Sequence, residues 1–231
     1  MIFTSPRANV TNTTDISICG QTVDKVDSTR FLGVLLDNKL NFRDHITHIR
    51  KKVARGIYIP GRARHFFDEL TIKDLYYAFI HPYFYYCNEI WGNTCSTYLD
   101  PLIKLQKRAI RIIAGVPGRS HTYELFQRFM IVRLDNLYKY NVYMFLYKLM
   151  NNQLPPGVRS SYMFNSEVHN HSTRFSQSQG LRMSTMTGGL KNRGFRHQTA
   201  LLQAERPDID YNVPIASFKY CLKTSLLCTE E

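Results

Sequence analysis

Short apolar runs separated by polar or glycine-containing breaks occupy the first 36 residues. The runs "MIFT", "DISICG", "QTVDKV" and "TRFLGVLL" have the length and composition of β-strands. Gly20-Gln21 is predicted as a two-residue hairpin turn between the second and third runs. Because so few strands cannot bury both of their faces alone, we expect another layer of structure to cover them.

The spacing of apolar residues changes to the period of an α-helix at about residue 41. A first helix is predicted from there to Pro60-Gly61, where proline and glycine interrupt the pattern. A second is predicted to start at Thr71 as N-cap, with Asp74 three residues on, and to be interrupted by Pro82. The apolar stripes of these two helices are Phe42, Ile46, Ile49, Val53 and Ile57, and Ile72, Leu75, Tyr76, Phe79 and Ile80.

A third helix has the clearest signals in the chain. Asp100 is predicted as its N-cap, Pro101 as its first helical residue and Gly115 as its end. Further helices are expected at about 121–130 and 134–150, and in the C-terminal "SFKYCLKTSLL". The Ser-, Gln-, Gly- and His-rich residues 165–199 are expected to form a loop, or a tail that orders on a partner.

These patterns together predict an α+β fold that is mostly α, with short antiparallel strands followed by a helical bundle. We expect three segments: a β-rich segment at 1–40, a helical domain at 41–156 and a loop-rich basic segment at 157–231 that ends in a short helix.

The charge of the chain adds an expectation about its partners, because an excess of basic residues suits a surface that binds polyanions. The 30 Lys and Arg residues exceed the 18 Asp and Glu residues, giving a net charge of +12, and the excess lies entirely beyond residue 40. A basic surface attracts phosphate backbones, although a basic protein without such a partner is the alternative. The third helix concentrates this charge opposite its apolar face, with no carboxylate between Pro101 and Gly118, where an ordinary solvated face is the other interpretation.

Motifs for catalysis are missing from the sequence. The close carboxylate pairs Asp24/Asp27 and Asp208/Asp210 do not follow apolar strands that would hold them for Mg²⁺. Neither a phosphate-binding glycine loop nor zinc-ligand spacing is found. The aromatic run "YFYYCNEIW" favours a packed helix junction over base stacking.

The 5 scattered cysteines, with no secretory signal and no apolar run long enough for a membrane span, indicate an intracellular chain, in the nucleus or cytoplasm.

The order of several segments adds a resemblance to a known family. The succession "MIF", "ISICGQTVDKVDSTRFLGVLLDNKLNFRDHI", "LYYAFIHPYFYYCNEIWGN" and "LIKLQKRAIRIIAG", followed by "HSTR", "LRMSTMTGG" and "SFKYCLKTSLL", resembles the C-terminal portion of a non-LTR (LINE-type) retrotransposon reverse transcriptase. The resemblance implies that residues 1–40 are the end of the palm and that residues 41–156 are a thumb-like domain. No FADD- or YADD-like sequence occurs. The catalytic aspartates, and the Mg²⁺ they bind, would therefore belong to a palm upstream of Met1, and we expect no polymerase activity from this chain alone.

The resemblance also implies partners and binding residues. A thumb holds an RNA/DNA or DNA duplex through sequence-independent backbone contacts, and this chain would also contact the missing palm and fingers of its parent enzyme. Phe31, Leu32 and Gly33 would form a primer-grip-like element, with the glycine allowing close backbone approach. An inert or co-opted protein-interaction module is the alternative. The expected nucleic-acid-binding residues are Lys104, Lys107, Arg108, Arg111, Arg50, Lys51 and Arg55.

Overall fold

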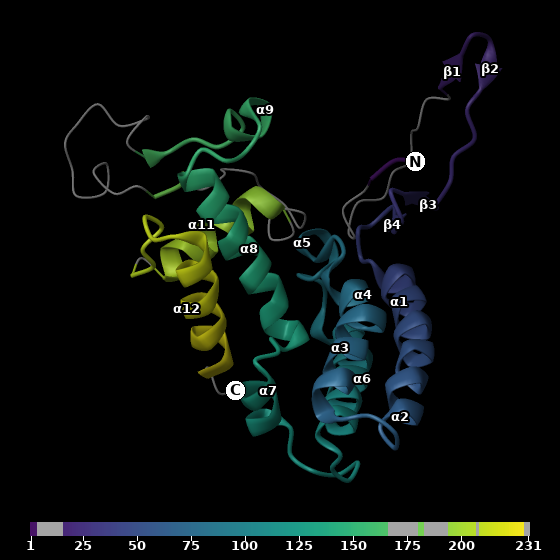
Figure 1. Cartoon of the computed structure of the whole chain (residues 1–231). Helices are drawn as coiled ribbons and strands as arrows, with labels where there is room; N and C mark the ends of the chain where they lie inside the picture. Colours follow the sequence, from purple (N-terminus) through teal and green to yellow (C-terminus); the bar gives the residue numbers. More distant parts are fainter. Residues whose placement is uncertain (4–15, 166–179, 183–193, 207, 229–231) are drawn as a thin grey trace.

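The computed structural model describes residues 1–3, 16–165, 180–182, 194–206 and 208–228. The described chain is mostly helical, with two short antiparallel strand pairs, and the expected fold class is confirmed. Most of the predicted loop or tail at 165–199 lies outside the described residues. Figure 1 shows the strands near the N-terminus, a group of helices beneath them and a second group that includes the C-terminal helix.

The first strand pair is a minimal hairpin. Strands β1 (Ser17–Ile18) and β2 (Gln21–Thr22) pair antiparallel, with Ile18 opposite Gln21. The turn residues are Cys19 and Gly20, both left-handed with φ of 52° and 79°. The predicted turn at Gly20-Gln21 is therefore wrong by one residue, because Cys19 adopts the left-handed conformation and Gln21 joins the ladder.

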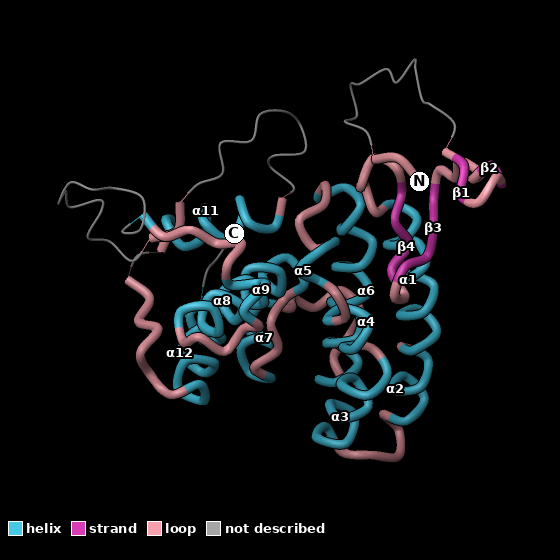
Figure 2. Tube along the Cα trace, turned by 90° about the horizontal axis from the view of Figure 1, so that it is seen from above, coloured by secondary structure: helices cyan, strands magenta, loops and turns pink. Residues whose placement is uncertain are grey.

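The second strand pair lies where the sequence predicts a single strand. The run "TRFLGVLL" does not form one strand, because β3 (Ser28–Phe31) and β4 (Val34–Asp37) pair as an antiparallel hairpin. Leu32 and Gly33 form its turn, with φ of 45° and 83°. A two-residue turn with both residues left-handed matches the natural twist of a hairpin, and glycine adopts that conformation without a steric cost. Figure 2 shows this hairpin beside α1.

Helix α1 (Arg43–Gly56) and the residues that flank it, Phe42 and Ile57, carry the predicted apolar stripe. All five side chains of this stripe are buried. The Asp37 carboxylate organises the turn from β4 into this helix, because it accepts hydrogen bonds from the backbone N–H groups of Lys39, Asn41 and Phe42. The short helix α2 (Tyr58–Ala63) follows directly.

Helix α3 (Glu69–Phe79) starts earlier than predicted. Its N-cap is Asp68, whose carboxylate accepts the backbone N–H of Thr71 at 3.2 Å. The prediction of Thr71 as N-cap is wrong, because Asp68, three residues upstream, accepts the N–H of Thr71 and caps the helix there. The Thr71 hydroxyl also donates to Asp68, and these hydrogen bonds lower the pKa of the Asp68 carboxyl.

The aromatic run beyond Ile80 forms two short helices, α4 (His81–Tyr85) and α5 (Asn88–Trp91). Phe84 and Trp91 are fully buried, and the Trp91 indole N–H donates to the carbonyl of Tyr86. These two rings fit the predicted helix junction, whereas the tyrosines at 83, 85 and 86 lie on the surface.

Helix α6 (Ser96–Ala114) begins one turn before the predicted Asp100 cap, so Pro101 lies inside it. Leu99 is buried in this first turn, and its packing holds the turn in place although the proline cannot donate a helical hydrogen bond. The predicted end is confirmed, because Gly115 is left-handed and the Val116 N–H donates to the carbonyl of Arg111.

The remaining helices complete the described chain. Helices α7 (Tyr123–Phe129) and α8 (Leu134–Met150) match the predicted ranges closely, and α12 (Ile215–Cys228) contains the predicted C-terminal helix. Two shorter helices, α9 (Pro156–Arg159) and α11 (Phe195–Glu205), were not predicted.

Two clusters of buried apolar side chains hold the fold together, and α8 contributes to both. The first lies among α1, α3, α4, α6, α7 and the start of α8, and the second among the rest of α8, α11 and α12. Figure 1 shows the corresponding two groups of helices, with α8 beside α12. The proposed domain boundaries at residues 40 and 156 stay predictions.

Candidate nucleic-acid interface

The four basic residues expected on the third helix lie on α6, away from its buried face. Lys104 and Arg108 are exposed, whereas Lys107 and Arg111 are half-buried. The opposite face packs into the core through Leu102, Ala109, Ile110 and Ile113. The amphipathic pattern of the sequence thus describes α6 correctly, apart from its buried Gln106.

The basic residues of α1 form a separate group. Arg50, Lys51 and Arg55 are all exposed, on a helix that packs beside α6. Figure 1 shows α1 at the outer side of the first helix group. None of the three lines the groove described next. The structure therefore does not gather the predicted binding residues into a single site.

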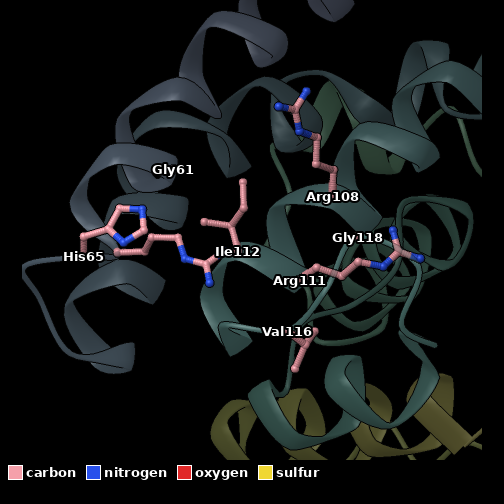
Figure 3. Close-up of a pocket in the computed structure, with 8 residues that line it drawn as sticks. Gly61, His65, Arg108, Arg111, Ile112, Val116 and Gly118 are labelled. Atoms are coloured by element: carbon pink, nitrogen blue, oxygen red, sulfur yellow. The ribbon is translucent and has the colours of Figure 1, made fainter.

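A groove of about 490 Å³ lies between α6 and the turn that follows α2, and we call it the α2–α6 groove. Figure 3 shows Arg108, Arg111 and Ile112 on α6, with His65 opposite them. Two predicted residues, Arg108 and Arg111, thus line the same groove as Arg64 and His65, which the sequence interpretation missed. The basic run "GRARH" at 61–65 is the sequence signal that could have pointed to them. The lining residues are Gly61, Arg64, His65, Arg108, Arg111, Ile112, Val116 and Gly118.

The hydrogen bonds of the groove arginines leave donors available. One guanidinium N–H of Arg64 donates to the carbonyl of Gly115 at 3.3 Å, and Nε of Arg111 donates to the carbonyl of Ser120 at 2.8 Å. Because a guanidinium carries five N–H donors, both side chains can still bind an anion. For Arg108 we find no hydrogen bond or ion pair among the described residues, and no described lining residue is acidic.

The same two hydrogen bonds also have a structural role. They satisfy carbonyls at and beyond the C-terminus of α6, where cations are favourable for the helix dipole as well. Arg64 and Arg111 therefore contribute to the fold whether or not an anion binds. Arg108 and Lys104 are the residues whose replacement tests binding without disturbing these contacts.

The expected primer-grip residues lie at the tip of the β3–β4 hairpin. Phe31 and Leu32 are 62% and 72% exposed. The carbonyl of Leu32 accepts a hydrogen bond from the Tyr86 hydroxyl at 2.7 Å. A Cβ atom on Gly33 would lie 3.4 Å from the Tyr86 ring, so this tyrosine packs against the turn. Tyr86, which sequence analysis did not single out, fixes the tip relative to α4.

Metal-binding and membrane-spanning features are absent from the part of the chain that the structure describes. No group of three or more His, Cys, Asp or Glu side chains there could hold a metal ion. None of the described helices combines the length and apolar character needed to cross a bilayer. The expectation that Mg²⁺ would bind only with an upstream palm is not tested by these residues.

The described chain thus combines a mostly helical fold with a groove that three arginines line. In sequence, the chain is 25% identical over 128 residues to the RNA-directed DNA polymerase from mobile element jockey of Drosophila melanogaster, which covers 52% of this chain. The same polymerase of Drosophila funebris is 27% identical over 128 residues and covers 51% of the chain. A probable RNA-directed DNA polymerase from transposon X-element of Drosophila melanogaster is 27% identical over 101 residues, or 40% of the chain.

These similarities confirm the resemblance to LINE-type retrotransposon reverse transcriptases. The matched segment accounts for only 14% of the length of each jockey polymerase and 11% of the X-element polymerase. No protein-family model and no solved structure matches the chain.

Proposed function

We propose that this chain is the part of a retrotransposon reverse transcriptase that grips the template–primer duplex, and that polymerisation requires a palm outside this chain. The observation that carries the proposal is the α2–α6 groove, which Arg64, Arg108 and Arg111 line without an acidic residue among the described lining residues. The names of the relatives, all RNA-directed DNA polymerases, support a nucleic-acid partner.

The chemistry of the groove suits a sliding grip. Guanidinium groups bind phosphate oxygens in pairs of hydrogen bonds. Contacts to phosphates carry no preference for base sequence, and a polymerase needs such contacts on the duplex it copies. Lys104 and Lys107 extend the same charged surface along α6, and Arg50, Lys51 and Arg55 provide a second one on α1. The hairpin tip at Phe31–Gly33 would contact the primer backbone, and Mg²⁺ would act with the upstream palm.

Replacement of Lys104 and Arg108 by glutamine is expected to weaken the salt dependence of duplex binding. Each lost phosphate contact lowers the slope of log K against log salt by about 0.9, so the double variant should lose about 2. The measurement is fluorescence anisotropy of a labelled RNA/DNA hybrid titrated with the protein at several salt concentrations. An Arg50/Lys51/Arg55→Gln variant measures the contribution of α1 in the same titrations.

The matched control for this experiment is Lys139→Gln/Lys148→Gln. Both lysines are exposed on α8, outside the α2–α6 groove, so the control removes the same charge from another surface. The control should keep the wild-type slope. Equal slopes for the two double variants would show that binding depends on net charge alone and would refute the proposed grip.

A protein-interaction module is the second candidate function, and exposed apolar side chains favour it. Phe66 and Phe67 are 83% and 58% exposed in the turn before α3, where Leu70 is 68% exposed. Apolar side chains gathered on a surface commonly mark a protein contact. This candidate becomes the better explanation if the chain does not bind the hybrid at low salt.

A further inference from the structure

A second pocket, of about 200 Å³, lies among α3, α4, α8 and α12, and we call it the tyrosine pocket. It is distinct from the α2–α6 groove, since the two share no lining residue. Figure 1 shows α3 and α4 in the first helix group and α8 and α12 in the second, so the pocket joins the two groups. The residues that matter for its chemistry are Tyr77, His81, Tyr85, Tyr140, Lys219 and Lys223.

Aromatic rings form one side of this pocket. His81 and Tyr85 are stacked, with centroids 5.7 Å apart and planes at 23°, and Tyr77 lies 5.0 Å from His81. The Tyr85 side chain is 45% exposed, so the stack is open to a ligand. Burial, followed by the nearby Lys223, lowers the pKa of His81 to about 4. His81 is therefore a neutral ring at physiological pH and does not repel the lysines.

Two lysines from α12 also line the pocket and add positive charge. Lys219 and Lys223 are spaced by one helical turn, which places them on the same face of the helix. Lys219 is exposed, whereas Lys223 is half-buried, and burial lowers its pKa. None of the described residues that line the pocket is acidic. Glu89 lies near Tyr85, whose pKa it raises after the larger effect of burial, but it does not line the pocket.

The size and chemistry of the pocket restrict its ligand. Its volume is below the range of about 300–1,000 Å³ that is typical of sites for drug-sized molecules, and so fits a single ring system. Stacked aromatic rings bind the flat face of a base, and ammonium groups bind the phosphate beside it. A base within a duplex cannot enter such a pocket, because both of its faces are already stacked.

We propose that the tyrosine pocket binds one unpaired base of a single-stranded nucleic acid, stacked on the His81–Tyr85 pair, with the adjacent phosphates on Lys219 and Lys223. The inference rests on the proposed function for the source of the strand, which would be a single-stranded extension of the template–primer. It goes beyond that function because it assigns a second site, with a different form of nucleic acid, to the pocket between the two helix groups.

The test is a titration of a short single-stranded DNA with one central 2-aminopurine, whose fluorescence decreases when the base stacks. Tyr85→Ala is expected to weaken binding about 5- to 150-fold, the range for loss of one stacked base, and to abolish the fluorescence decrease. Tyr220→Ala, on a 65% exposed tyrosine of α12 outside the pocket, is the matched control and should bind as wild type.

Two single lysine variants, one in the pocket and one outside it, give an independent readout if Tyr85→Ala fails to fold. Lys219→Gln is expected to lower the salt slope for the single strand by about 0.7, whereas Lys148→Gln should leave it unchanged. Equal effects of Tyr85→Ala and Tyr220→Ala, or of the two lysine variants, would overturn the pocket. Displacement of the strand by AMP at equal concentration would also overturn it, since the site would then hold a free nucleotide.

The RNA/DNA hybrid titrations on the same proteins separate this inference from the proposed function. Hybrid binding that depends on Lys104 and Arg108, together with no effect of Tyr85→Ala on the single strand, would overturn the tyrosine pocket alone. Absence of hybrid binding, with single-strand binding that depends on Tyr85, would overturn the proposed grip and support the pocket. Absence of both would overturn both.

Discussion

Replacement of Gln106 by leucine is expected to lower the free energy of unfolding by about 3–5 kcal/mol, although leucine is similar in volume and more hydrophobic. The Gln106 side chain is 1% exposed, inside the otherwise apolar face of α6. Its amide nitrogen donates to the Val132 carbonyl at 3.0 Å and to the Tyr76 hydroxyl at 3.2 Å, and its oxygen accepts the N–H of Leu134 at 2.9 Å.

The size of this effect follows from the groups that leucine would leave behind. The Val132 carbonyl lies just before α8 and the Leu134 N–H is the first of that helix, so neither group has a helical partner of its own. Each buried polar group left without a partner costs about 1–3 kcal/mol, and the gain from burying two methyl groups in place of the amide offsets only part of that. Urea unfolding followed by far-UV circular dichroism measures the change.

Tyr76→Phe provides the control for this prediction. It removes only the hydroxyl that accepts from Gln106 and keeps the buried ring, so it should cost about 1 kcal/mol. If Gln106→Leu were no more destabilising than Tyr76→Phe, the start of α8 would not depend on the Gln106 amide. Apolar packing, not these hydrogen bonds, would then stabilise the contact between α6 and α8.

Gln106 also shows what periodicity can and cannot predict. The apolar stripes of α1 and the extents of α7 and α8 follow from local spacing, and the structure agrees with them. A glutamine within an apolar face has no local signature, because its partners lie on α3 and at the start of α8. Sequence spacing alone therefore could not distinguish this buried polar connection from a solvated side chain.

The errors in the strand region have a different cause. The run "TRFLGVLL" is apolar enough for one strand, but Leu32 and Gly33 both adopt the left-handed conformation, and a hairpin results. The stability of this turn comes partly from Tyr86, which is distant in sequence and hydrogen-bonds the Leu32 carbonyl. Tertiary contacts thus decide a conformation that local propensity leaves open.

The candidate site was predictable only in part for the same reason. Lys104, Lys107, Arg108 and Arg111 follow from the amphipathic pattern of one helix. The groove exists because the turn after α2 brings Arg64 and His65 to the C-terminal end of α6, more than 40 positions further along the chain. No local sequence pattern predicts the tyrosine pocket, since it combines residues from four helices.

Acidification from pH 6.5 to pH 4 is expected to destabilise the fold by about 3 kcal/mol through His45 alone. His45 is 3% exposed and connects β4 to α1, because its Nδ1 accepts the backbone N–H of Leu35 at 3.3 Å. Its ring packs edge-on against Trp91, and its Nε2 has no hydrogen-bond partner among the described residues. Burial, followed by the nearby His48, lowers the pKa of His45 to about 4.

The direction of the effect follows from proton linkage. Between pH 6.5 and pH 4 the unfolded chain binds a proton at His45 that the folded chain does not, so the free energy of unfolding falls as the pH falls. Protonation would also turn Nδ1 into a donor facing the N–H of Leu35 and break that hydrogen bond. His81, whose pKa burial also lowers to about 4, acts in the same direction.

Thermal or urea unfolding of wild type and His45→Gln between pH 7.5 and pH 4 isolates the contribution of His45. The variant should be less stable than wild type at pH 7.5, since glutamine fits the site less well, but it should lose less stability on acidification. Comparing the two proteins cancels the titration of carboxylates, which both share. His48→Gln serves as the control and should keep most of the wild-type pH dependence, because His48 is less buried. If wild type and His45→Gln lost stability in parallel, protonation of His45 would not cause the loss of stability at low pH. The connection between the hairpin and α1 would then tolerate a charged ring.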